Sequence, residues 1–178
     1  MPEPDTITWP TLDENSASSL CYTSGTAGFP KGVLYSHRST LLHSYAISMA
    51  DVLGISAQDV TLPVVPMFHV NAWGVPYAAA MNGAKLVLPG PNLDPVNLLE
   101  LIENERVTML LGVPTVWMAL LAHLRSVGKK LTTIRKVTIG GSACPPPMIE
   151  AWEKEHGDRG LLASEIADQL PGVLAALR

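Results

Sequence analysis

The segment 22–33, Tyr-Thr-Ser-Gly-Thr-Ala-Gly-Phe-Pro-Lys-Gly-Val, has residue types that suit phosphate binding. Glycines allow backbone N–H groups to turn toward an anion, hydroxyls can bond phosphate oxygens or Mg²⁺, and a lysine adds a mobile positive charge. A short apolar run precedes the segment, which is therefore predicted to be a loop that leaves a strand. The P-loop of NTPases is excluded, because its lysine follows a glycine and Lys31 follows Pro30. The candidate phosphate-binding residues are Thr23, Ser24, Gly25, Thr26, Gly28 and Lys31.

The same segment resembles the phosphate loop of the adenylate-forming enzymes, which include acyl-CoA synthetases, luciferases and peptide-synthetase adenylation domains. Their pattern runs Thr-Ser-Gly-Thr-Thr-Gly-x-Pro-Lys-Gly, and this chain departs from it at Ala27, where the family usually has a second threonine. A glycine-rich turn without any ligand is the alternative, and the length of the match argues against it. The resemblance implies that Thr23 helps to hold Mg²⁺. It also implies that Thr26 and Lys31 hold the outer phosphates of ATP, with Lys31 as a catalytic residue.

Composition limits the partners and the location of the protein. The chain has 178 residues, of which 47% are hydrophobic, so it is predicted to be one domain with strands buried on both faces, or a piece of a larger body. A net charge of −4 without any Lys/Arg cluster argues against nucleic acid or an anionic membrane as partner. No apolar stretch reaches the roughly 20 residues of a transmembrane helix. Cys21 and Cys144 are predicted to be reduced, buried thiols of a cytoplasmic protein.

Strand-like and helix-like segments alternate along the chain. This pattern predicts an α/β fold with a mostly parallel sheet covered by helices. Predicted strands cover 33–35, 60–65, 85–88, 108–111 and 137–139. Predicted helices cover 36–54, the segment ending near 81, a segment that starts at 94–95 and includes 98–102, and the ranges 114–127, 147–156 and 164–177. Residues 1–18 are predicted to be a loose lead-in. With the resemblance, residues 19–157 become a partial AMP-binding (adenylation) domain and residues 158–178 a divergent helical tail.

The segment 66–74, Pro-Met-Phe-His-Val-Asn-Ala-Trp-Gly, resembles the part of acyl-CoA synthetases at the junction between the nucleotide and the acyl pocket. A histidine in an apolar loop is more often a satisfied core residue than a catalyst, and an isolated tryptophan is usually packing. The resemblance favours function here. It implies that Val70 and Trp73 lie against the nucleotide or the mouth of the acyl tunnel, with Trp73 as a gate, and that His69 shapes the acyl site as a second catalytic residue.

The segment Gly-Gly-Ser-Ala at 140–143 follows a predicted strand, at the edge where open α/β sheets bind ligands. The resemblance places Gly141 at the nucleotide, where adenine can approach the backbone. A structural turn is the alternative. A nucleophile elbow is excluded, because Gly-x-Ser-x-Gly would need glycine at the position of Cys144.

Together, residues from about 10 to 157 resemble an internal piece of a medium- or long-chain fatty-acyl-CoA synthetase. The implied reaction is ATP-dependent activation of a fatty acid to acyl-AMP and then acyl-CoA. The implied ligands are the fatty acid, ATP with Mg²⁺, and coenzyme A as co-substrate, and the resemblance leaves room for a homodimer of the full-length enzyme. A non-catalytic nucleotide-binding or interaction module that retains the fold is the alternative from another class.

After Gly157 the sequence departs from the family pattern. The family continues with a strand and then an aromatic-Gly-x-Thr-Glu motif, whose glutamate holds Mg²⁺. Here residues 158–178 lack that motif and favour a helix with a cap at Ser164. Neither Glu165 nor Asp168 is expected to replace the missing glutamate. We therefore expect a truncated or frame-shifted fragment that is inactive alone, although a genuine short protein also fits this pattern.

Overall fold

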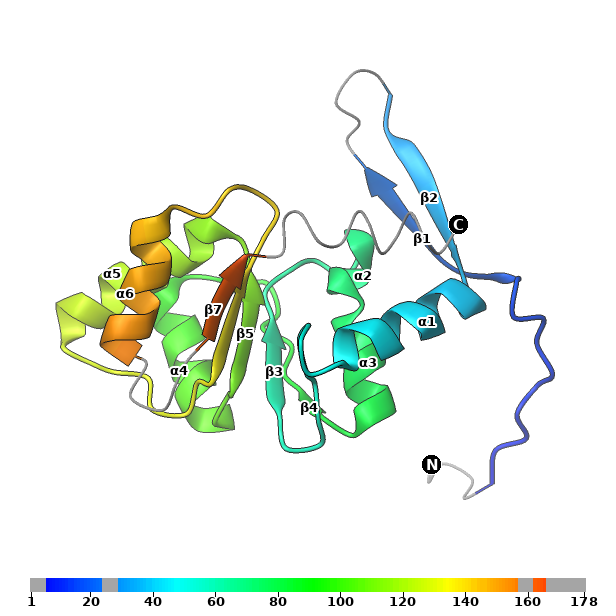
Figure 1. Cartoon of the computed structure of the whole chain (residues 1–178), viewed down its shortest axis with the longest axis horizontal. Helices are drawn as coiled ribbons and strands as arrows, with labels where there is room; N and C mark the ends of the chain where they lie inside the picture. The colour runs from blue at the N-terminus through cyan, green and yellow to red at the C-terminus, as the bar shows by residue number, and fades with distance from the viewer. Residues whose placement is uncertain (1–5, 24–28, 157–161, 166–178) are drawn as a thin grey trace.

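The protein consists of an antiparallel hairpin and a five-stranded parallel sheet with helices on both faces (Figure 1). The computed structural model describes residues 6–23, 29–156 and 162–165. The hairpin pairs β1 (Ala17–Thr23) with β2 (Lys31–Ser36). The parallel sheet has the order β4-β3-β5-β6-β7. Its strands are β3 (Val60–Pro63), β4 (Lys85–Leu86), β5 (Met109–Gly112), β6 (Lys136–Ile139) and β7 (Leu162–Glu165). The predicted α/β class is confirmed.

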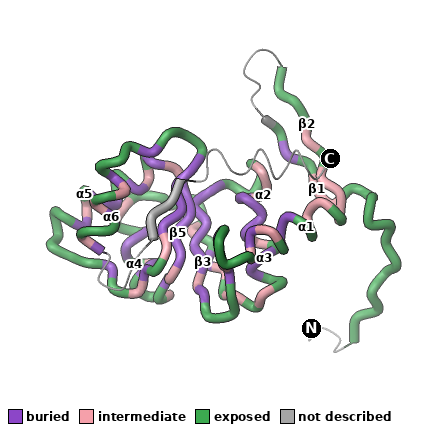
Figure 2. The backbone as a smooth tube through the Cα atoms, viewed as in Figure 1, coloured by how far each residue is buried: buried purple, intermediate pink, exposed green. Residues whose placement is uncertain are grey.

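Two groups of helices cover opposite faces of this sheet, because successive side chains of a strand point to opposite sides. On β5, Leu110 belongs to one core, while Met109 and Leu111 belong to the other. The first core packs under α4 (Pro95–Glu105), α5 (Pro114–Val127) and α6 (Pro146–His156). The second packs under α1 (His37–Ser48), α2 (Val70–Trp73) and α3 (Val75–Asn82). Figure 2 shows the buried residues concentrated in the strands of the parallel sheet and the helices against it, whereas most residues of the hairpin are exposed or intermediate.

Several helix ends follow the local signals of the sequence. The carboxylate of Asp94 accepts hydrogen bonds from the first turn of α4, and Pro95 occupies that turn, as predicted. Gly128 ends α5 with a φ of +64°, also as predicted. Helix α1 ends at Ser48 instead of continuing to Gly54, which has a φ of +60° in the turn after it. No helix in the described parts of the chain is long and apolar enough to cross a membrane.

The prediction for the chain after Gly157 is wrong in its first step. Residues 162–165 form β7 parallel to β6, with Leu162 beside Lys136 and Glu165 beside Ile139, so a helix does not begin at Ser164. Local helix propensity is a weak preference, whereas β6 without β7 would present a row of unpaired backbone groups. The predicted tail helix beyond residue 165 lies outside the described residues. The lead-in is also shorter than predicted, since β1 begins at Ala17.

The connections from β3 and β5 leave the sheet in opposite directions. After β3 the chain passes through α2 and α3 on one face and returns as the neighbour β4. After β5 it passes through α5 on the other face and returns as β6. A topological switch point therefore lies between β3 and β5, and ligands of open α/β sheets bind outside the carboxyl ends of the strands at such a point.

Candidate nucleotide and acyl site

Two of the segments singled out by sequence, 66–74 and 140–143, emerge at the carboxyl edge of the parallel sheet, on either side of the segment 112–117, which starts at the end of β5. Directly after β3, the N–H of Val64 donates to the carbonyl of Leu111 at 2.7 Å. Directly after β6, the N–H of Gly140 donates to the carbonyl of Gly112 at 3.1 Å. The segments 64–73, 112–117 and 140–143 thus begin at adjacent strand ends next to the switch point. Ligands of open α/β sheets bind at this kind of position.

Gly141 gives this edge an open, side-chain-free approach to the backbone. It is exposed and has a φ of +84°, a conformation that L side chains rarely adopt. A Cβ atom added there would lie 3.1 Å from Cγ1 of Val113, at the end of the neighbouring strand β5. Both conformation and space therefore favour glycine at this position, as a close approach of ligand to backbone would require.

The hairpin holds Thr23 and Lys31 opposite each other at its far end, where β1 and β2 pair in register (Figure 1). Lys31 is exposed and forms no ion pair with any residue that the structure describes. The hairpin is a sheet separate from the one that carries Gly141. The other predicted loop residues, Ser24, Gly25, Thr26 and Gly28, lie outside the described residues. Their predicted phosphate contacts stay predictions.

The segment between β3 and α3 contains a turn of left-handed backbone. Val70, Asn71, Ala72 and Trp73 have φ values of 49°, 51°, 48° and 57° in succession. Each non-glycine residue in this conformation costs roughly 1–2 kcal/mol, so such runs are rare outside glycine-rich sequences. A turn of this kind persists only where its surroundings hold it in place.

Contacts on two sides hold the left-handed turn. The side-chain amide of Asn71 donates to Oγ of Ser19 at 2.9 Å and accepts from Sγ of Cys21 at 3.2 Å, which binds the turn to β1. On the opposite side, Nε2 of the buried His43 in α1 lies 3.1 Å from the carbonyl oxygen of Trp73. The turn is thus bound to the hairpin and to α1 at once.

The structure separates the three predicted residues of this segment by exposure. His69 is exposed and precedes the turn, and Val70 is half-buried. Trp73 is only 6% exposed and packs in the second core with Ile47 and Met109. The predicted roles of His69, Val70 and Trp73 toward nucleotide and acyl chain stay predictions, and any opening by Trp73 must begin from this packed position.

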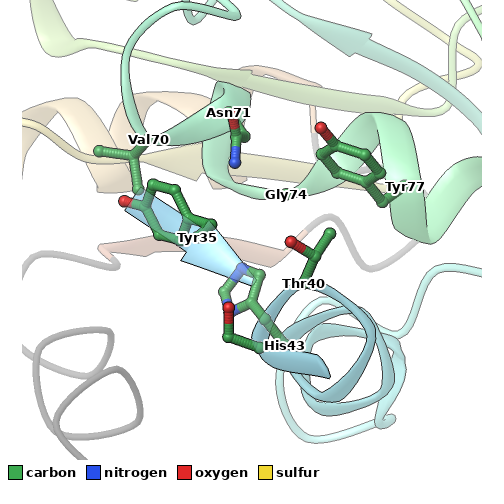
Figure 3. A pocket seen from close by; sticks show the side chains of 8 residues that line it. Tyr35, Thr40, His43, Val70, Asn71, Gly74 and Tyr77 are labelled. Atoms are coloured by element: carbon green, nitrogen blue, oxygen red, sulfur yellow. The ribbon is translucent and has the colours of Figure 1, made fainter. Parts of the chain in front are cut away.

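A small cavity lies between the turn, the hairpin and α1 (Figure 3). Its volume is about 30 Å³, which is room for one water molecule. Tyr35, His43, Val70 and Asn71 are among its lining residues. His43 lines this cavity, and its buried Nδ1 has no hydrogen-bond partner among the residues that the structure describes, so a single water molecule is the natural occupant.

Burial changes the acidity of Tyr35, which lines the same cavity. Its partial burial and, to a lesser degree, the neighbouring Cys21 raise the pKa of its hydroxyl above the ordinary value. The tyrosine therefore stays neutral. The side chains of Cys21 and Cys144 are both buried, which confirms the predicted burial of the two thiols.

A buried carboxylate at the opposite, amino edge of the sheet is structural. Asp59 precedes β3, accepts hydrogen bonds from Ser56 and Thr108, and pairs with Arg135 at 2.7 Å. Burial alone would raise the pKa of Asp59, but the hydrogen bonds and the guanidinium charge together hold it below its usual range. Asp59 stays ionised and ties β3 to the start of β6. No group of three or more metal-ligating side chains occurs within the described ranges.

Comparison with known proteins identifies the family. The sequence model of the family described as "AMP-binding enzyme" matches residues 3–164. The chain belongs to the AMP-binding enzyme family. The match extends past Gly157 through most of β7, in agreement with the strand found there. Solved members share the fold: O-succinylbenzoate coenzyme A synthetase of Bacillus subtilis, in complex with ATP and magnesium, aligns over 81% of this chain and 29% of its own, with a TM-score of 0.69 and 26% identity.

Two curated members of the AMP-binding family are much more similar in sequence. The 3-methylmercaptopropionyl-CoA ligase of Ruegeria lacuscaerulensis is 60% identical over 149 residues, or 84% of this chain. The medium-chain-fatty-acid–CoA ligase of Ectopseudomonas oleovorans is 60% identical over 153 residues, or 86% of this chain. The chain spans 28% of the length of each of these relatives.

Sequence reasoning missed the residues that hold the site together. His43 lies in a regular helix, and no local pattern distinguishes it from a surface histidine of an amphipathic helix. Asn71 and Ser19 are 52 positions apart, so only the folded chain shows that they meet. The one available signal is Asn71 itself, because asparagine tolerates left-handed backbone better than most residues.

Proposed function

We propose that this protein carries the phosphate-loop part of an ATP-dependent acid–CoA ligase that activates a medium- or long-chain fatty acid. The observation that supports this most directly is the assembly of segments 64–73, 112–117 and 140–143 at adjacent strand ends beside the switch point. The sequence of the loop that joins β1 to β2 adds the phosphate-binding groups. Relatives at 60% identity that are named as CoA ligases give the reaction class.

The proposed reaction has two steps. A carboxylate oxygen of the acid forms a bond to the α-phosphorus of ATP, the bond from that phosphorus to the bridging oxygen breaks, and pyrophosphate leaves. The sulfur of coenzyme A then bonds to the acyl carbonyl carbon. The bond from that carbon to the oxygen on the AMP phosphorus breaks, AMP leaves with this oxygen, and the thiol proton passes to solvent. Both steps concentrate negative charge, which preorganised donors and cations stabilise in a transition state.

Lys31 and the loop are proposed to stabilise the negative charge of the phosphates. Lys31 and the hydroxyl of Thr26 would bond the outer phosphates, and the exposed position of Lys31 leaves its ammonium group available. The hydroxyl of Thr23 would help to hold Mg²⁺, which would supply positive charge beside the phosphates. Ser24, Gly25 and Gly28 would contribute loop hydroxyl and N–H groups.

The carboxyl edge is proposed to bind the rest of the substrates. The bare backbone at Gly141 would lie against the adenine ring. Val70 and Trp73 would lie against the nucleotide or the mouth of the acyl tunnel, with the packed indole of Trp73 as the gate that must move to admit the acyl chain. His69 is exposed at the entrance to this segment and would shape the site around the carboxylate.

The two similar relatives point to acids of different length as the substrate. One similar enzyme is named for medium-chain fatty acids, and another for 3-methylmercaptopropionate, a short acid with a thioether. A panel of octanoate, palmitate and 3-methylmercaptopropionate therefore tests the substrate class. We propose preference for the fatty acids.

The test is pyrophosphate release with this panel, on the full-length Ectopseudomonas oleovorans relative and on the present chain. We expect turnover by the relative and none by the present chain, because the sequence lacks the aromatic-Gly-x-Thr-Glu motif after β7. Turnover by the present chain would overturn the expectation that it is inactive alone. Absence of ATP binding to it, measured by calorimetry, would favour a non-catalytic interaction module.

Substitution of Lys31 tests the phosphate assignment. Lys31→Ala is expected to weaken ATP binding by about 10- to 100-fold, as loss of a charge-assisted contact worth roughly 1.5–3 kcal/mol predicts, and AMP binding much less. Lys154→Ala, which removes an exposed cation of α6, is the matched control and should change neither affinity. Equal losses for ATP and AMP would place Lys31 away from the outer phosphates.

A further inference from the structure

One side-chain amide joins two parts of the site that are far apart in sequence. Nδ2 of Asn71 donates to Oγ of Ser19 at 2.9 Å, and Sγ of Cys21 donates to Oδ1 of Asn71 at 3.2 Å. Ser19 and Cys21 are two residues apart on β1, so their side chains lie on the same face of the strand. The donor and the acceptor of the Asn71 amide thus both bond side chains of β1.

Asparagine suits this position on two independent grounds. It tolerates the φ of +51° found here better than a branched or bulky residue would. It also presents a donor and an acceptor side by side, which the Ser19 hydroxyl and the Cys21 thiol require. In Figure 3 Asn71 projects from the segment between β3 and α3 beside the other residues that line the cavity.

We infer that Asn71 is a positioning residue that couples the strand entering the glycine-rich loop to the left-handed turn carrying Val70 and Trp73. The inference rests on the proposed function for the roles of these two segments. Thr23 lies two residues beyond Cys21, roughly 7 Å along an extended strand. A displacement at the base of the loop when phosphate binds is therefore transmitted to the turn through the Asn71 amide.

The turn is also bound on its other side, by α1. Because it is held at both sides, a movement on the β1 side deforms the turn instead of shifting it as a whole. Nε2 of His43 lies 3.1 Å from the carbonyl oxygen of Trp73, so α1 holds the end of the turn while Asn71 connects its second residue to β1. Movement of β1 relative to α1 then changes the conformation of the turn. The backbone conformation of Val70 and Trp73 therefore depends on the position of the hairpin relative to α1.

Two variants break the link from opposite sides. Asn71→Gly removes the amide and keeps the tolerance for left-handed backbone, whereas Ser19→Ala removes the hydroxyl acceptor and leaves the turn sequence intact. Ser18→Ala is the matched control, because the Ser18 hydroxyl bonds the carbonyl of Tyr35 and Oγ1 of Thr40 instead of Asn71. If Asn71→Gly does not fold, Ser19→Ala alone carries the test.

The first measurement is amide hydrogen exchange of the present chain without ligand. Amides of β1 and of the turn are expected to exchange about five- to tenfold faster in Ser19→Ala, which loses one part-buried hydrogen bond, and at least as much faster in Asn71→Gly, which loses the bonds to Ser19 and Cys21; β5 and β6 should be unchanged. The double variant should match Asn71→Gly alone. Faster exchange in β1 only, or additive effects of the two substitutions, would overturn the link.

The second measurement adds ATP and separates coupling from simple support. In the wild type, ATP should slow exchange beside the loop and also in residues 70–74. In Asn71→Gly it should slow exchange beside the loop only, with ATP affinity within about threefold of wild type. Equal protection of the turn in both proteins would overturn the coupling. If ATP slows no amide in the wild type, the proposed function fails for this chain, and the ligand-free measurement decides whether the link exists.

Discussion

Two features require glycine at position 74, at the end of the left-handed turn: the backbone conformation there and the closeness of the His43 ring. Its φ is +72°, and an added Cβ would lie 2.4 Å from Cδ2 of His43. Gly74→Ala is expected to cost roughly 2–4 kcal/mol in the free energy of unfolding, from strained backbone plus a collision with a buried ring. Urea unfolding followed by tryptophan fluorescence measures this.

Gly83 supplies the control for Gly74. Its φ of +71° is nearly the same, but the nearest atom to an added Cβ is 3.9 Å away. Gly83→Ala should therefore cost only about 1 kcal/mol, the backbone part of the effect. In a His43→Ala background the Gly74→Ala cost should fall to nearly that value. Equal costs at Gly74 and Gly83 in the wild type would show that the contact with His43 is unimportant.

Asp59 makes part of the stability depend on pH. Because its native pKa lies below the unfolded value near 3.9, its contribution is complete above that pH and is lost as the pH falls through the native pKa. Asp59→Asn is expected to lower stability at pH 7 by about 1–3 kcal/mol.

The difference between wild type and Asp59→Asn should shrink below about pH 4, where the wild-type carboxyl also becomes neutral. Urea midpoints measured between pH 3 and pH 7 follow this change. Asp51→Asn, at an exposed aspartate, is the control and should show no such trend. A difference that stays constant with pH would mean that shape at position 59, rather than charge, stabilises the fold.

Among the elements, α1 has a reciprocal cap that can be tested by itself. The Ser36 hydroxyl accepts from the N–H of Ser39 at 3.1 Å, and the Ser39 hydroxyl accepts from the N–H of Ser36 at 3.0 Å. Ser36→Ala should lower stability by about 1 kcal/mol and the Tm by about 2–4 °C, and Ser36→Gly by much less. Ser126→Ala, near the end of α5, is a control expected to change the Tm by less than 1 °C, roughly as for other surface sites. A normal Tm for Ser36→Ala would contradict the capping role.

The elements that were predicted well from sequence are those whose ends are marked by capping residues, prolines or glycines. The Asp94-Pro95 start of α4 and the Gly128 end of α5 follow from hydrogen-bonding and backbone preferences of single residues. The strand β7 was missed, because the partner that makes it a strand is β6, and Leu162 meets Lys136 only in the fold. The left-handed turn was missed for the same reason. Val70 and Ala72 have no preference for that conformation, which contacts from β1 and α1 impose.

At the scale of the candidate site, sequence predicted which segments matter and could not say how they are arranged. The glycine pair at 140–141 and the segment 66–74 do lie at the same edge of the sheet, after β6 and β3, the two strands that flank β5, as a parallel sheet requires. The packing of Trp73 into the second core could not be predicted, because a tryptophan after a histidine-containing loop is equally compatible with a surface gate.

Across the whole molecule, apolar side chains remain exposed on the hairpin and on α1. Leu20, Tyr22 and Leu34 form the outer face of the hairpin and are 53%, 62% and 66% exposed. Exposed apolar faces favour association and dye binding. Leu20→Lys combined with Leu34→Lys is expected to reduce both binding of a hydrophobic dye and light scattering at least twofold, roughly in proportion to the apolar face removed.

Two exposed positions elsewhere control for the added charge. Leu88 and Val96 are 54% and 59% exposed outside the hairpin, and their replacement by lysine should change dye binding and scattering little. The free energy of unfolding should stay within about 0.5 kcal/mol for both double variants. Equal reductions by the two pairs would show that net charge, and not the hairpin face, governs association.

The strand order β4-β3-β5-β6-β7 allows the protein to fold as it is synthesised. Each strand after β3 adds to a free edge: β4 to one side of β3, β5 to the other, and then β6 and β7 in turn. No strand must enter between two that are already paired, so the sheet can grow in the order in which the chain leaves the ribosome, at roughly 5–20 residues per second. The hairpin closes in about 1–10 μs. Asn71 is made 52 residues after Ser19 and before β4, so the joint between loop strand and turn can form while most of the sheet is still unsynthesised.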